Sequence, residues 1–135
     1  MRQAAILSGL ALLAACGSSA ASGEPRTVPV GTWGGDHVLL EVAVGGASLE
    51  LDCAHGAVEG AIRLDSEGRF DAGGTYVQER GGPVREGGED ARPARYAGRV
   101  EGKTMTLTIA VGDGEETLGP FELVHGRSAR LTKCL

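Results

Sequence analysis

The sequence is poor in aromatic residues, which make up 4% of its 135 residues. One Trp, two Tyr and two Phe cannot fill a core alone, so packing must depend on Val, Leu, Ile and Ala. No segment shows the apolar periodicity of a convincing amphipathic helix. We therefore expect an all-β domain with an aliphatic core.

No apolar run is long enough to cross a membrane as a helix. The longest covers residues 4–13 and is interrupted by Ser8 and Gly9, whereas a membrane-spanning helix needs about 20 apolar residues. Arg2 supplies a positive charge just before this run. The pattern is typical of a cleaved secretory signal.

The end of the signal is Leu13-Ala14-Ala15-Cys16, which resembles the lipobox of bacterial lipoproteins. The resemblance implies that residues 1–15 are removed and that the Cys16 thiol carries diacylglycerol as the first mature residue. Gly17, not Asp, follows Cys16. In a source with two membranes, this implies an export route to the periplasmic face of the outer membrane. The alternative is an ordinary secreted protein, because the general signal peptidase also cuts after small residues.

Positive charge is scarce, with 13 Lys and Arg against 18 Asp and Glu. This balance argues against nucleic acid or an anionic membrane surface as an electrostatic partner. Residues 16–28 are small and polar and predict a flexible, lipidated tether. Residues 29–135 then form one folded domain.

Apolar alternation punctuated by Gly predicts seven to nine short antiparallel strands. The inward residues of the clearest three strands are Val38, Leu40, Val42 and Val44, then Ala47, Leu49, Leu51 and Cys53, then Met105, Leu107, Ile109 and Val111. The last strand is expected at 129–134, and 81–94 is expected to be a long, mobile loop. Such a meander favours a small antiparallel up-and-down β-barrel, which removes exposed edges, with a β-sandwich as the alternative.

Gly31-Thr32-Trp33 resembles the Gly-x-Trp signature that opens the first strand of lipocalins and related barrels. Small bacterial barrels such as META-type lipoproteins and periplasmic lysozyme or protease inhibitors begin in a similar way. The resemblance implies that Trp33 plugs the barrel floor against an Arg from the last strand, for which Arg127 and Arg130, near the C-terminus, are candidates. The alternative is that Trp33 is an ordinary core aromatic.

Three cysteines are present, and lipidation of Cys16 leaves the pair Cys53 and Cys134. An even pair in an exported protein predicts a disulfide. Closing a loop of this length would stabilise the fold by about 4 kcal/mol in the chain-entropy description. Two free buried thiols are the alternative.

Catalytic and metal-binding signals are weak. The three histidines, His37, His55 and His125, lack metal-site spacing, and no Ser lies in a nucleophile elbow. Asp36-His37 and His55 near Asp52 place acid beside imidazole at strand ends, where they could converge on one barrel rim. The alternative is solvated turn residues. We therefore expect no enzyme activity, no metal and no cofactor.

Two functions remain open from the sequence. The first is a binding module for an envelope protein, for example a hydrolase to be inhibited, or for a small ligand held as in lipocalins. The second is an accessory lipoprotein whose main property is its place in the envelope. Small barrels are filled by their own side chains, which favours protein binding through loops over an internal ligand.

Overall fold

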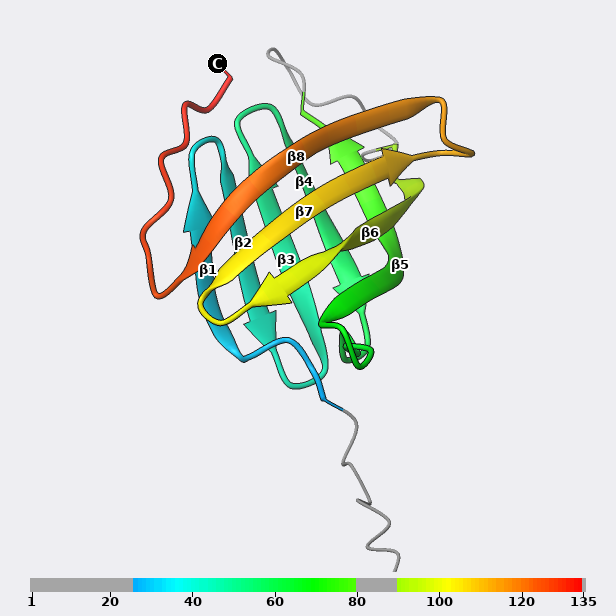
Figure 1. The fold of residues 1–135 in the computed structure, drawn as a ribbon. Coiled ribbons are helices and arrows are strands. Elements are labelled where there is room, and N and C mark those ends of the chain that lie inside the picture. The colour runs from blue at the N-terminus through cyan, green and yellow to red at the C-terminus, as the bar shows by residue number, and fades with distance from the viewer. Residues whose placement is uncertain (1–25, 80–89, 135) are drawn as a thin grey trace, which may run out of the picture.

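The computed structural model describes residues 26–79 and 90–134. Within them, eight antiparallel strands pair in chain order and close into a barrel (Figure 1). The strands are β1 (Gly31–Gly35), β2 (Val38–Ala43), β3 (Gly46–Leu51), β4 (Ala54–Glu59), β5 (Arg69–Gln78), β6 (Arg92–Glu101), β7 (Thr104–Val111) and β8 (Glu116–His125). The predicted up-and-down barrel is confirmed, and the alternative β-sandwich is not formed.

Alternation of apolar and polar residues fixes which face of each strand is inside. Leu40 of β2 lies opposite Leu49 of β3, and both are buried, because side chains two apart share one face of a strand. Two predicted inward residues lie elsewhere. Val44 is 83% exposed because β2 ends before it and the turn begins. Cys53 lies beyond the end of β3, in the turn to β4.

The predicted strand at 129–134 is not formed. β1 already pairs with β2 on one side, and β8 occupies its other side at Trp33 and Gly34, so closure leaves too little of that edge for a ninth strand. Only an isolated parallel bridge joins Arg130 to Asp36. The predicted loop at 81–94 is also shorter at its end, since β6 begins at Arg92. Residues 80–89 lie outside the described chain.

The barrel interior is filled by large side chains. Trp33, Leu40, Tyr96, Met105 and Leu107 are each at most 1% exposed, and no polar or charged residue is buried in the described parts of the chain. The Tyr96 hydroxyl donates a hydrogen bond to the Thr75 carbonyl at 2.5 Å. Burial raises the pKa of this hydroxyl to about 12.

Residues 26–30 close one end of the barrel, although the sequence predicts that 26–28 belong to the tether. The Val28 amide donates to the Ile62 carbonyl at 2.9 Å, and the Leu64 amide donates to the Arg26 carbonyl at 2.7 Å. Val28 and Ile62 are 2% and 3% exposed. The folded domain therefore includes Arg26, and its closing segment depends on a partner far along the chain.

Because neighbouring strands are antiparallel, their turns alternate between the two barrel ends. We call the end with residues 26–30, 43–46, 59–69, 101–104 and 125–128 the basal end. The opposite end holds the turns after β1, β3 and β7 and the end of β5, and residues 126–134 reach it from the basal end along the outside of the barrel (Figure 1).

Candidate functional site

Residues 126–134 form a C-terminal strap that lies against the outside of β1 (Figure 1). The Gly126 amide donates to the Thr32 carbonyl at 2.7 Å, and the Arg130 amide donates to the Gly35 carbonyl at 3.1 Å. The His37 amide in turn donates to the Arg130 carbonyl at 2.7 Å. The strap thus continues the pairing of β1 where β8, which pairs only with Trp33 and Gly34, moves away.

Gly34 is the residue of β1 that lets the strap lie so close. A Cβ atom at this position would overlap the Arg127 carbonyl oxygen and come within 2.8 Å of the Ala129 amide nitrogen. Both contacts are with backbone, which cannot rotate away as a flexible side chain could. Any larger residue at Gly34 would therefore push the strap off the barrel.

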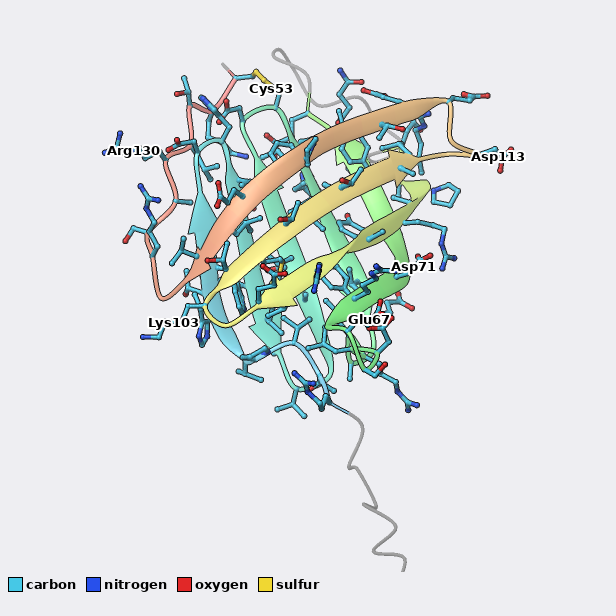
Figure 2. All side chains as sticks on the ribbon, viewed as in Figure 1. Cys53, Glu67, Asp71, Lys103, Asp113 and Arg130 are labelled. Carbon is cyan, nitrogen blue, oxygen red and sulfur yellow. A yellow bond between two sulfur atoms is a disulfide. The ribbon has the colours of Figure 1, made fainter. Side chains whose placement is uncertain are left out.

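A disulfide fixes the far end of the strap. The predicted bridge between Cys53 and Cys134 is present, with the two Cα atoms 5.1 Å apart, within the usual range for disulfides. Figure 2 shows its yellow bond beside the labelled Cys53, at the end opposite the basal end. The Cys134 amide also donates to the Asp52 carbonyl at 3.1 Å. We call this end, with the strap attached to it, the strapped rim.

Asp52 is the acceptor at the centre of the strapped rim. Its Oδ1 accepts a hydrogen bond from the Thr132 amide at 2.7 Å, and its Oδ2 lies 2.6 Å from His37 Nδ1. The Thr132 amide is the main reason that the pKa of Asp52 is lowered, and His37 adds to it, although burial opposes both. The ionised carboxylate therefore holds the β1–β2 turn and the strap together.

Lys133 makes a second set of links. Its Nζ lies 2.8 Å from a carboxylate oxygen of Glu50 and 3.0 Å from one of Glu79, and it donates to the Leu51 carbonyl at 2.9 Å. The hydrogen bond to Glu50 is the largest cause of the raised pKa of Lys133. His55 Nδ1 lies 3.0 Å from Oε1 of the same Glu79 carboxylate. The strap is thereby tied to the ends of β3 and β5 as well.

The residues predicted to converge, Asp36, His37 and His55, all lie on the strapped rim but do not form one site. His37 pairs with Asp52, and His55 pairs separately with Glu79. Asp36 is exposed and is held through its backbone bridge to Arg130. Across residues 26–79 and 90–134, no group of three or more His, Cys, Asp or Glu residues is arranged to hold a metal ion.

Trp33 is fully buried in β1, and the ring against it is His125. The two ring centroids are 4.6 Å apart with an interplanar angle of 27°, and the indole Nε1 donates to the Pro29 carbonyl at 2.9 Å. Arg127 and Arg130, the candidates for this contact, have exposed side chains. They belong to the strap on the outer side of β1, so the predicted Arg contact is replaced by His125.

Sequence reasoning missed several residues of the rim, namely Glu50, Glu79, Thr132 and Lys133. The links between the strap and the barrel join positions 54 to 83 residues apart, and no local spacing indicates such pairs. His125 did leave a signal, because alternation places it on the same face as the buried Leu123. The polar contacts of the rim link its turns to the strap, which the disulfide also fixes.

In the part of the chain with assigned structure, no helix is long and apolar enough to span a membrane. No protein-family model, curated protein or solved structure matches the chain.

Proposed function

We propose that this chain is a membrane-anchored envelope lipoprotein whose barrel is a non-catalytic binding module for a protein partner. The filled interior is the observation that carries the proposal. Trp33, Tyr96 and Met105 are buried inside the barrel, where a lipocalin-type ligand would have to lie. Recognition must then take place on the surface. The anchor rests on the lipobox that ends at Cys16.

The strapped rim is the surface that best suits this role. The disulfide and the links of Asp52 and Lys133 hold its turns together before any partner arrives. A surface ordered in advance loses less conformational entropy on binding, and this leaves more of the contact free energy as affinity. Loops positioned by a rigid scaffold are also where binding residues most often lie.

Charge defines the kind of partner that the rim would accept. Its described segments, residues 35–38, 50–55, 78–79, 90–92, 111–117 and 130–134, contain eight acidic and three basic residues. Asp36 and Asp113 are exposed, and Figure 2 shows Asp113 at the outer tip of the turn between β7 and β8. Complementary charge favours a partner with a basic surface. A hydrolase inhibited through this rim is the most specific form of the proposal.

Affinity purification from detergent-solubilised membranes tests the proposal. The wild-type protein should retain one stoichiometric partner, and the double variant Asp36→Lys/Asp113→Lys should lose it. Glu67→Lys/Asp71→Lys makes the same charge change away from the rim and should retain it (Figure 2). Recovery of only bulk envelope components would instead favour an accessory lipoprotein without a dedicated partner. An inhibition assay on the recovered partner then tests the hydrolase form.

A further inference from the structure

The basal end is one continuous surface built from segments far apart in the sequence. The Gly60 amide donates to the Gly45 carbonyl at 3.0 Å, which joins the β2–β3 turn to the β4–β5 loop. The His125 amide donates to the Lys103 carbonyl at 2.8 Å, and His125 Nε2 lies 3.0 Å from the Val30 carbonyl oxygen. These contacts fix the end of β8 against the β6–β7 turn and the closing segment.

This surface carries exposed apolar side chains. In the described part of the chain, Val30 and Val44 are the large hydrophobic residues left exposed, at 55% and 83%, and both belong to the basal end. Val44 lies in the β2–β3 turn, beyond the last residue of β2. Neither side chain is needed to fill the barrel, and removing either one from water would lower the free energy.

The basal end is also the less acidic end of the barrel. Its segments contain five basic and four acidic residues, against three basic and eight acidic residues on the strapped rim. The basal cations are Arg26, Arg63, Arg69, Lys103 and Arg127. The Asp65 carboxylate stays negatively charged while it accepts hydrogen bonds from the amides of Glu67 and Arg69, each at 2.8 Å. Because the basal end has a charge of +1 and the rim −5, an anionic surface would favour the orientation that brings the basal end toward it.

The chain before the barrel joins it at this same end. Arg26 lies ten residues after Cys16. A chain of that length reaches at most about 35 Å when fully extended, and about 18 Å on average if it is flexible. An acyl group on Cys16 would thus keep the basal end near the bilayer surface at all times.

We propose that the basal end docks on the anionic headgroups of the bilayer that holds Cys16. Its cations contact lipid phosphates, and Val30 and Val44 enter the headgroup layer. This inference rests on the proposed anchor at Cys16 and adds an orientation to it. Docking turns the strapped rim away from the membrane, toward a partner.

Chemical tethering tests the docking separately from natural lipidation. With Cys53 and Cys134 in their disulfide, Cys16 is the free thiol of the mature chain and can be coupled to a maleimide lipid. A polarity-sensitive fluorophore is attached through an azide-bearing residue at position 44 or position 113. The vesicles are phosphatidylcholine with or without about 30% phosphatidylglycerol, and nitroxide-labelled lipids serve as the quencher.

On anionic vesicles, we expect a blue shift and quenching at position 44 and neither at position 113. Charge reversal of Arg26, Arg63, Lys103 and Arg127 should abolish the difference, because each cation at an anionic surface contributes about fivefold to the docked population. Arg92→Glu/Arg130→Glu on the rim is the control and should leave the difference unchanged.

Equal signals at the two positions would overturn the docking, and so would a signal at position 44 that is the same on neutral vesicles. A signal that depends on protein density but not on lipid charge would indicate a second copy of the chain and would also overturn it. Because the tether is supplied chemically, none of these results bears on whether Cys16 is lipidated in cells.

Discussion

The Trp33 indole and the His125 imidazole stack where the first and last strands of the barrel meet. Their ring centroids are 4.6 Å apart, and the two residues lie opposite each other in the register of β1 and β8. Only one other residue pair, Gly34 with Val124, joins these strands. The stacked rings therefore stabilise the least paired junction of the barrel.

Trp33→Leu and His125→Ala should each destabilise the fold, and their effects should not add, because either change removes the stack. Stacked aromatic pairs contribute about 0.5–1.5 kcal/mol beyond the area they bury, so a double-mutant cycle should give a coupling free energy of that size. Urea unfolding of the wild type, both single variants and the double variant measures it. The pair Trp33→Leu and Arg130→Ala is the control and should be additive. Zero coupling between Trp33 and His125 would exclude the stack as a stabilising contact.

Gly31→Ala should weaken the same junction. Gly31 has φ +132°, and a Cβ there would lie 2.8 Å from His125 Nε2. We expect a loss of about 1–3 kcal/mol, typical of a side chain forced into such a backbone conformation. Gly45→Ala is the control, because a Cβ at Gly45 meets nothing within 4 Å. Adding His125→Ala to Gly31→Ala should relieve the part of the loss that comes from the clash with the imidazole. A Gly31→Ala protein as stable as the wild type would contradict the conclusion that the junction requires glycine at position 31.

Loss of the disulfide should free the strap and lower the stability of the whole barrel. Cys53 and Cys134 are 81 residues apart in sequence, and the chain-entropy description gives a loss of about 4 kcal/mol for a loop of this length. Urea unfolding of Cys53→Ser/Cys134→Ser measures the loss, and hydrogen exchange should show faster exchange of the Arg130 and Thr132 amides. Unchanged exchange at these two amides would mean that the strap is held without the bridge.

The Asp52 carboxylate should make the stability of the rim depend on pH. Its pKa is lowered below the ordinary value of 3.8, chiefly by the Thr132 amide. A lowered folded-state pKa adds stability above the unfolded-state value, and that stability is lost as pH falls through the lowered pKa. Asp52→Asn should therefore be less stable than the wild type at pH 7, and the difference should shrink as pH falls below 3.8 and through the lowered pKa. Asp113→Asn is the control, and a constant difference between wild type and Asp52→Asn at every pH would contradict the assignment.

The fold was predictable because its main determinant is local. Alternation in segments such as 104–111 sets the inward face without knowledge of the partner strand, and short turns then favour a meander. The prediction of a strand at 129–134 is wrong because closure is a property of the whole sheet. Once β8 pairs with Trp33 and Gly34, too little of the β1 edge remains for another strand, and the last residues form the strap instead.

The site was less predictable because its links join distant positions. The Cys53–Cys134 bridge could be inferred from residue chemistry alone, since few cysteines leave few pairings. Lys133 has no such constraint, and its pairing with Glu50 and Glu79 follows only from the path of the strap. The sequence likewise predicts that Val28 belongs to the tether, because its burial depends on Ile62, far along the chain, and no local pattern indicates that contact.

The central claim is that this barrel is held on a membrane through Cys16, and intact-mass spectrometry of the protein isolated from membranes of producing cells tests it most directly. The account predicts a mature chain that begins at Cys16, carries the added mass of acyl groups and keeps one disulfide. Cys16→Ser should lose that mass and leave the membrane pellet. An unmodified Cys16, or a Cys16→Ser protein that stays in the pellet with unchanged mass, would contradict the claim.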